Sequence, residues 1–502
     1  MTTKYQFRSV YPCLLVLLLT FFTASGFGNR ESLSDKYQIH IDGNSVKKAI
    51  VECEILLEDD QLYMSSIGAN QFPSRWAHFV SDLEAWSLEG DPIQIDTLEG
   101  SNWKVHADAG ARIRLRYQIN LDHENFKWSG GVDGAAYARD WGVFYTGRSI
   151  FIMNGQDKKD IVVEFDVPKK WKVSSPWNNS SAQPFVYTVT NLTTLSDSMF
   201  FAGTHQEYRI KRENFELIFA FGGAEILARK YEFTNMAESI MDYYINLMGG
   251  VPNPSPEDAF DKSIVILNSS SNTDGEVIGN HISLLLKENG DMMSEMIGRF
   301  IFAHEFFHLW NGKSFTPSGN DCEWFKEGVT NYYTLKALYH IGFLNEDAYL
   351  KTLNDLFYQR YDKDEGVGVY SLTQGDLKHD HWGLIYSGGM FTGIAQDMVI
   401  RSSTSNKKSL DNIMRHLYNK YGGTNQGYEL EELESLFSEA SGTDQAQFFK
   451  DHISGPKRIP LYKYLNIGGF KAKEIDGNLI VLLKNEPTAM DKELNEGFFG
   501  VN

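Results

Sequence analysis

The chain has 502 residues, of which 42% are hydrophobic and 23% are charged, the composition of a folded globular protein and not of a disordered one. Lys and Arg number 47 against 66 Asp and Glu, and the net charge of −19 argues against general nucleic-acid binding, which needs a basic surface. The length predicts about three domains of ordinary size.

The first predicted element is a secretory signal peptide. Lys4 and Arg8 precede an apolar run from Leu14 to Phe22, and small residues follow at positions 24–26. The run is too short to cross a hydrocarbon layer of about 30 Å. We therefore predict a signal peptide over residues 1–27, no transmembrane span in the mature chain, and a secreted, periplasmic or extracellular location.

Removal of the signal peptide leaves two cysteines, Cys53 and Cys322. Two cysteines are too few for the disulfide framework of a small secreted domain. We expect two buried free thiols, and a single bond between them is the alternative.

Residues 28–222 have the alternating pattern of β-strands. From Ile113 to Leu121 apolar and polar residues alternate over nine positions, the period of a half-buried strand. Shorter runs at 163–167 and 215–219 repeat the pattern, and turn-rich stretches separate the runs. We predict a β-rich, sandwich-like N-terminal domain over residues 28–222, without catalytic residues of its own.

After Gly222–Gly223 the pattern becomes mostly helical. Short strands are predicted at 264–267 and 276–287, and helices at 224–249, 291–310, 323–340, 344–360, 386–403, 408–420 and 428–450. This order predicts an α+β domain over 223–405, a helical C-terminal region over 406–465 and a C-terminal tail over 466–502.

The motif with the clearest chemistry is His304-Glu305-Phe306-Phe307-His308, within the helix predicted at 291–310. Residues four apart lie on one face of a helix, so both imidazoles can reach a single zinc ion at about 2.0–2.1 Å. Glu305 projects beside the same site and can take a proton from an attacking water without ligating the metal. The apolar neighbours of this motif make unpartnered polar residues costly, which favours a metal site over hydrogen-bonded core histidines.

A catalytic zinc ion needs a third protein ligand and an open position. Glu327, on the next predicted helix, completes the two-histidine, one-glutamate set that is typical of hydrolytic zinc sites. Glu323, one turn earlier, is the alternative ligand. Asn331, one turn beyond Glu327, can accept a hydrogen bond from a ligand histidine, and a surface helical residue is the alternative for it.

These residues resemble a known family. The string from His304 to Asn311, the string Trp324-Phe325-Lys326-Glu327-Gly328 and the pair Tyr332-Tyr333 are similar to the M61 glycyl aminopeptidases, which are gluzincin zinc metallopeptidases related to the M1 aminopeptidases. The resemblance covers residues 36–470. It implies a multidomain fold with an N-terminal β-sandwich-like domain, a thermolysin-like α+β catalytic domain and a C-terminal helical region. Many members also carry a PDZ domain, for which residues 466–502 are too few.

The resemblance implies one Zn²⁺ per chain, held by His304, His308 and Glu327, with Glu305 as the general base. A further donor must stabilise the oxyanion. Spacing alone leaves Tyr386, His379 and His381 as candidates. The family resemblance favours Tyr386, because gluzincin aminopeptidases use a tyrosine beyond the third ligand.

The family also has an edge strand that receives the substrate, and Gly279, Asn280 and His281 align with it. Asn280 stands where the family has an acidic residue, which would bind the ammonium group of a free amino terminus. Either Glu276 or Glu323 supplies that charge, or the selectivity for amino termini is relaxed.

The sequence therefore predicts a secreted zinc metallopeptidase that acts on peptides or proteins as an aminopeptidase of the glycyl type. A zinc endopeptidase with relaxed recognition of the amino terminus, and a non-catalytic peptide-binding exoprotein, are the alternatives. The excess of acidic over basic residues favours cationic or neutral peptides as substrates. The sequence leaves the oligomeric state open.

Overall fold

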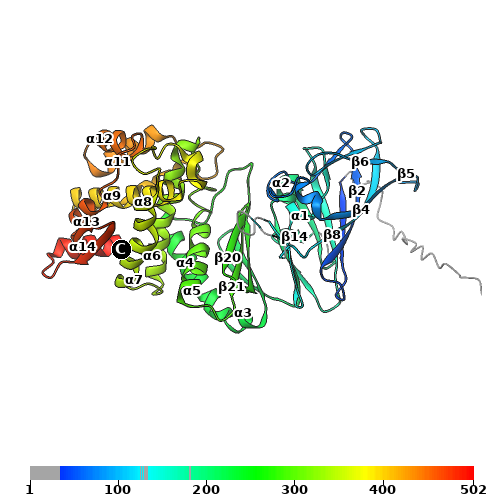
Figure 1. The fold of residues 1–502 in the computed structure, drawn as a ribbon, viewed down its shortest axis with the longest axis horizontal. Coiled ribbons are helices and arrows are strands. Elements are labelled where there is room, and N and C mark those ends of the chain that lie inside the picture. The colour runs from blue at the N-terminus through cyan, green and yellow to red at the C-terminus, as the bar shows by residue number, and fades with distance from the viewer. Residues whose placement is uncertain (1–33, 125, 127, 129–133, 180–182, 502) are drawn as a thin grey trace, which may run out of the picture. The chain divides into compact units, whose positions relative to one another are not determined.

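The structure is a computed structural model that describes residues 34–124, 126, 128, 134–179 and 183–501 (Figure 1). From Ser34 onward the chain forms one compact unit. The predicted signal peptide lies outside the described residues. Among the described helices, none is both long and apolar enough to cross a bilayer.

The N-terminal region is rich in β-sheet. Its main sheet has eight strands in the order β14-β15-β12-β1-β2-β8-β4-β5, with bounds β1 Lys36–Ile41, β2 Lys48–Leu56, β4 Val80–Ser87, β5 Pro92–Ile93, β8 Arg112–Asn120, β12 Lys159–Asp166, β14 Asn178–Asn179 and β15 Val186–Asn191. Two four-stranded sheets accompany it, formed by β13 Lys172–Ser174, β16 Met199–Gly203, β10 Gly142–Thr146 and β9 Tyr137–Arg139, and by β11 Met153–Asn154, β3 Gln61–Tyr63, β7 Asn102–Val105 and β6 Ile95–Thr97.

The strand predicted between Ile113 and Leu121 is β8, and its alternate residues are buried. These residues join one large apolar core within the N-terminal region. Cys53 belongs to this core, and both Cys53 and Cys322 are buried free thiols, which confirms that prediction.

A five-stranded sheet follows, in the order β17-β18-β19-β21-β20, with bounds β17 Gln206–Arg212, β18 Phe215–Gly222, β19 Lys262–Ser270, β20 Asp274–Ile278 and β21 His281–Lys287. Both faces of the sheet are buried, as the apolar run from Ile264 to Leu267 requires. One face joins the core of the helices, and the other packs against Phe144 and Phe201 of the N-terminal region. The sequence-based division at residue 222 falls within this sheet, because β18 pairs in parallel with β19, a long-range contact that no local pattern reports.

The single strand predicted over 276–287 is wrong, because β20 and β21 form a hairpin. Gly279 and Asn280 make its turn, and the φ of Gly279 is +62°, a left-handed conformation that favours glycine. β20 is the edge strand of the sheet.

Helices occupy most of the remaining chain, and α5 lies beside β20 and β21 in Figure 1. The helical elements as far as residue 403 are α3 Ala224–Ala228, α4 Lys230–Met248, α5 Met292–Phe307, η2 Asn320–Cys322, η3 Trp324–Val329, α6 Thr330–His340, α7 Glu346–Thr352, η4 Leu353–Tyr358, α8 Gln359–Lys363, η5 Gly375–His379, η6 Gly383–Ser387 and α9 Gly388–Ser403. Three of them, η3, η4 and η6, are π-helical turns, which are frequent at functional sites.

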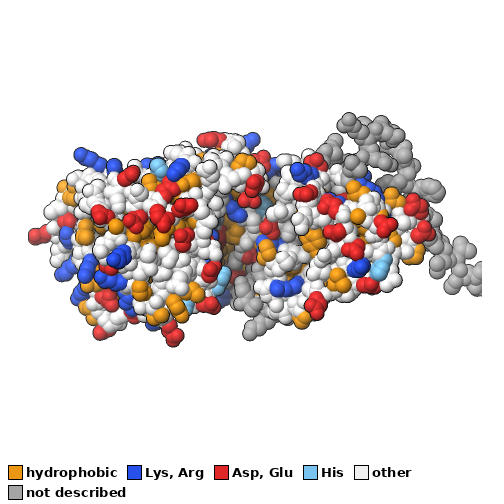
Figure 2. Space-filling view, turned by 90° about the horizontal axis from the view of Figure 1, so that it is seen from above, with side chains coloured by type: hydrophobic (Ala, Val, Ile, Leu, Met, Phe, Trp, Pro, Cys, Tyr) orange, Lys and Arg blue, Asp and Glu red, His pale blue; other side chains and the backbone are white. Residues whose placement is uncertain are grey.

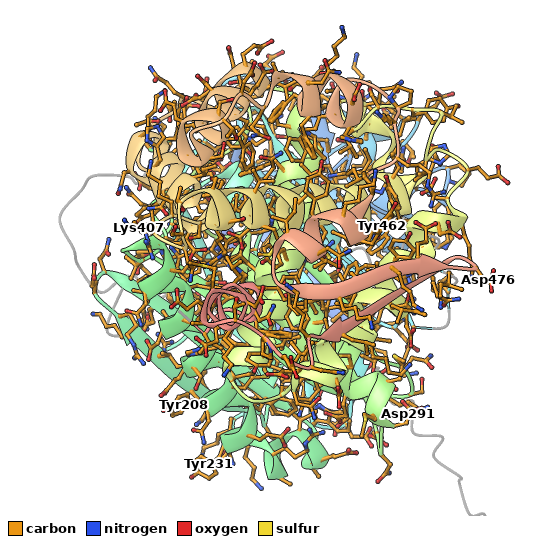
Figure 3. The ribbon with its side chains drawn as sticks, turned by 90° about the vertical axis from the view of Figure 1, so that its left-hand side faces the viewer. Tyr208, Tyr231, Asp291, Lys407, Tyr462 and Asp476 are labelled. Atoms are coloured by element: carbon orange, nitrogen blue, oxygen red, sulfur yellow. The ribbon has the colours of Figure 1, made fainter. Side chains whose placement is uncertain are left out.

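The C-terminal part is also mainly helical, and it shares the apolar core of the preceding helices. Its elements are α10 Leu410–Tyr421, α11 Leu430–Ser441, α12 Ala446–Phe448, η7 Phe449–Ile453, α13 Leu461–Ile467, β22 Phe470–Ile475, β23 Asn478–Leu483 and α14 Ala489–Phe499. Asp476 marks the turn of the β22–β23 hairpin in Figure 3. Phe470 and Phe498 are buried in the shared core, so the hairpin and α14 are packed parts of the fold.

Candidate active site

Helix α5 carries His304, and His308 is the C-cap residue that follows the last turn. The helix begins at Asp291, labelled in Figure 3, whose carboxylate accepts a hydrogen bond of 2.9 Å from the Ser294 amide and so caps the first turn. The rings of Phe302 and Phe306 are buried in the core on one side of the helix. Opposite them, His304 and its neighbour Glu305 line a large cavity. The cost of exposing the phenylalanines fixes which face of α5 meets that cavity.

The three predicted metal ligands converge. The Nε2 atoms of His304 and His308 lie 3.1 Å apart, and Glu327 Oε2 lies 3.2 Å from His308 Nε2 and 3.5 Å from His304 Nε2. Ligand atoms at 2.0–2.1 Å around a tetrahedral zinc ion are about 3.3 Å from one another. The triangle therefore has the size that zinc needs. Within the described residues, it is the one group of three or more such side chains that could hold a metal ion.

Glu327 is presented by the π-helical turn η3. Burial alone would raise the pKa of Glu327, but the adjacent His308 and His304 hold it well below the ordinary value, so the carboxylate is charged. Its other oxygen, Oε1, lies 3.3 Å from Lys378 Nζ. The turn thus directs one carboxylate oxygen to the histidines and the other to a lysine.

Glu323, the alternative ligand, is held away from the histidines by two lysines. Lys326 Nζ lies 2.6 Å from Glu323 Oε1, and Lys378 Nζ lies 2.7 Å from Glu323 Oε2. Both of its carboxylate oxygens are therefore engaged, and Glu323 is not part of the group of three.

Asn311 orients the second histidine, a role that its residue type does not predict. Its carbonyl oxygen lies 2.8 Å from His308 Nδ1, which leaves Nε2 to face the other ligands. Its side-chain amide donates to the carbonyl of Lys326 and to Thr330 Oγ1, both at 3.1 Å. Asn311 therefore joins the end of α5 to the turn that carries Glu327.

Asn331 does not contact either histidine through a hydrogen bond that the structure shows. Its Nδ2 donates to the carbonyl of Tyr386 at 3.4 Å. Within the described residues, Asn331 Oδ1 and His304 Nδ1 are both buried without a hydrogen-bond partner.

Glu305 lines the cavity next to His304. Burial raises the pKa of Glu305 above its ordinary value, and the nearby charge of Glu327 acts in the same direction. A carboxyl group with a raised pKa is suited to exchange protons near neutral pH.

Tyr386 lies on the π-helical turn η6, and its ring centre is 6.4 Å from that of His304. Trp382 stacks on it with ring centres 5.0 Å apart and planes at 6°. Burial raises the pKa of Tyr386, so its hydroxyl stays protonated and can donate. The cavity is lined by Tyr386 but by neither His379 nor His381, and His381 Nδ1 is 2.8 Å from the Asp364 carboxylate.

The cavity has a volume of about 1350 Å³. One wall is the exposed face of α5, where Met292, Met296 and Phe300 succeed one another at intervals of four residues up to His304. The segment 344–360 contributes another wall, which is mixed: Leu344, Ala348 and Leu356 alternate with polar and charged side chains. An apolar cavity with a few polar groups at one end is typical of a substrate site.

The β20–β21 hairpin places the three predicted substrate-binding residues in two different environments. Gly279 and Asn280 line the cavity, whereas His281 faces the sheet, is only 4% exposed and accepts a hydrogen bond of 3.3 Å from the Ile264 amide. Burial lowers the pKa of His281 to about 3, so it is neutral. The side-chain amide of Asn280 donates to the carbonyl of Lys262 at 2.6 Å.

Neither acidic residue that was expected to replace the missing charge at Asn280 lines the cavity. Glu276 accepts a hydrogen bond from the backbone amide of Gly134, a contact between the hairpin and the N-terminal region. Glu323 is engaged with its two lysines.

The fold and the site define a peptidase, and comparison with known proteins supports this class. Residues 70–204 match the peptidase M61 N-terminal domain, and residues 298–420 match the M61 glycyl aminopeptidase domain, which includes all three metal-ligand candidates. The chain belongs to the M61 family of peptidases, as its residues predicted.

The fold is similar to that of a solved structure. The crystal structure of an aminopeptidase N family protein from Idiomarina loihiensis superimposes with a TM-score of 0.73 at 20% identity, over 88% of this chain and 79% of that one. Yeast LTA4 hydrolase in complex with bestatin gives a TM-score of 0.49 at 12% identity, over 85% of this chain and 68% of that one. No curated protein sequence matches the chain. The sheet-rich N-terminal region and the helical C-terminal part agree with the multidomain architecture predicted from the sequence.

Proposed function

We propose that the protein is a secreted, zinc-dependent aminopeptidase that hydrolyses peptide bonds in the cavity beside α5. The observation that carries the proposal is the triangle of His304, His308 and Glu327, whose ligand atoms lie 3.1–3.5 Å apart. Secretion rests on the N-terminal sequence pattern.

A zinc ion held by the three ligands would supply Lewis-acid chemistry, which activates water and polarises the scissile carbonyl. Glu305 takes the proton from the attacking water and delivers it to the leaving amine. The Tyr386 hydroxyl donates a hydrogen bond to the oxyanion as it develops. Lys378 holds the non-ligating oxygen of Glu327, and Asn311 holds His308, so both ligands are oriented before substrate binds.

The proposal is tested with aminoacyl reporter substrates, with and without a chelator. Turnover should disappear on chelation and return when zinc is added. Turnover that resists complete removal of the metal would refute zinc dependence.

A zinc endopeptidase is the second candidate, and one observation favours it. Of the acidic residues that line the cavity, Asp291 caps α5 and Asp355 pairs with Lys351, which leaves only Glu305 and Glu327, both assigned to the metal centre. A free peptide and its N-acetylated form separate the candidates. An aminopeptidase should lose nearly all turnover of the blocked peptide, whereas equal turnover would establish the endopeptidase.

Replacing Tyr386 with phenylalanine is expected to lower kcat by about 10²–10³-fold, the range for loss of one oxyanion donor, with little change in KM. The ring and its stack on Trp382 are retained, so the fold should be unaffected. The matched variants are His379→Gln and His381→Gln. A loss in either of those with an active Tyr386→Phe enzyme would transfer the role to a histidine.

A further inference from the structure

Four carboxylates and four cations line the cavity, but two of the cations have no ion-pair partner among the described residues. The lining carboxylates are all engaged, at the metal centre, at the cap of α5 or with Lys351. Among the lining cations, Lys326 is paired with Glu323. Arg360 and Lys313 form no ion pair with any described residue. On the face drawn in Figure 2, acidic and basic side chains are interspersed, as expected where surface charges have neighbours of opposite sign.

Arg360 is held in place by an aromatic ring and not by an anion. It lies on α8, and its guanidinium carbon is 4.6 Å from the ring centre of Trp382. When the plane of a guanidinium group stacks on an aromatic ring, its N–H donors point outward in that plane and remain free to bind an anion. Burial lowers the pKa of Arg360, and no neighbouring carboxylate counteracts the shift.

The same stack leads from Arg360 to the metal centre. Trp382 stacks on Tyr386 at 5.0 Å, and Tyr386 is 6.4 Å from His304 between ring centres. With the 4.6 Å step from Arg360 to Trp382, the guanidinium lies within about 16 Å of the His304 ring. An extended chain advances about 3.3–3.6 Å per residue, so this reach corresponds to at most about five residues.

We propose that Arg360, held on Trp382, binds a carboxylate of the peptide substrate within about five residues of the cleaved bond. This inference rests on the proposed peptidase function and names its substrate class. Two sources of that carboxylate have the same chemistry, the C-terminus of a short peptide and an Asp or Glu side chain. The unpaired Arg360 thus favours anionic substrates, the opposite of what the net charge of −19 suggests.

The test compares kcat/KM for matched peptide pairs of three to five residues. In the first pair, one peptide ends in a free carboxylate and the other in an amide. In the second pair, both peptides have an amidated C-terminus, and one contains Asp where the other contains Asn. Because Arg360 is exposed at the cavity, we expect the acid of one pair to be preferred by about tenfold, the low end for a charge-assisted hydrogen bond. The pair that shows the preference identifies the source.

Arg360→Gln should reduce that preference to about one while turnover of the uncharged peptide is retained. Lys363→Gln is the matched control, because it removes an exposed cation from the same helix outside the cavity and should leave the preference unchanged. The proposal is overturned if wild type shows no preference in either pair, if Arg360→Gln keeps it, or if Lys313→Gln abolishes it instead. An enzyme without turnover of any peptide would contradict the proposed function itself.

Discussion

Replacing Glu305 with glutamine is expected to reduce kcat by about 10³-fold, within the 10²–10⁴-fold range of general acid–base catalysis, while zinc remains bound. The amide has nearly the same size as the carboxyl group but cannot accept the proton of the attacking water. Since Glu305 is not one of the three converging ligands, the metal content should stay at one ion per chain. Initial rates and elemental analysis of the same preparation provide the two measurements.

Glu288→Gln is the matched control, because Glu288 is exposed in the turn before α5. This variant should behave as wild type. A Glu305→Gln enzyme with full activity would refute the assigned base. A Glu305→Gln enzyme that is inactive because it has lost its metal would instead place Glu305 among the ligands.

The spacing of the metal-binding motif is informative because helix geometry is local. Residues four apart, such as His304 and His308, share a face whatever the rest of the fold does. The apolar residues around them then decide which face is buried. For the same reason the alternating pattern of β8 could be read directly from the sequence.

Other features of the site depend on contacts that local patterns do not report. The expected strand at 276–287 is interrupted by the turn at Gly279, and two adjacent apolar runs look like one strand when only their composition is considered. A π-helical turn adds a residue without changing the apolar period enough to be noticed, so the turns that carry Glu327 and Tyr386 read as ordinary helix.

Residues that act through their backbone are also missed. Asn311 orients His308 with its carbonyl oxygen, which every residue type possesses, so the side chain gives no indication of that role. The cavity wall at 344–360 meets α5 only in the folded chain, and Arg360 gains its place from Trp382, which is distant in sequence.

The third ligand gives the second large effect, because Glu323 and Glu327 are four residues apart and equally suitable by chemistry. Glu327→Gln is expected to weaken zinc binding by more than about 100-fold, since it removes the charged ligand itself and not only a group that orients a ligand. Glu323→Gln should retain zinc, because it disturbs only the contacts with Lys326 and Lys378. Zinc content after dialysis against a competing chelator measures the difference.

A thermal measurement separates loss of the metal from loss of the fold. A ligand that binds only the native state stabilises it by about 2.7 kcal/mol at a concentration one hundred times its Kd. Added zinc should therefore raise the Tm of metal-free wild type and of Glu323→Gln by similar amounts, and that of Glu327→Gln by much less. If added zinc raised the Tm of Glu327→Gln by much more than that of Glu323→Gln, Glu323 would be the ligand. That outcome would require the turn η3 to rearrange, since both Glu323 oxygens are engaged with lysines while Glu327 Oε2 already faces the two histidines.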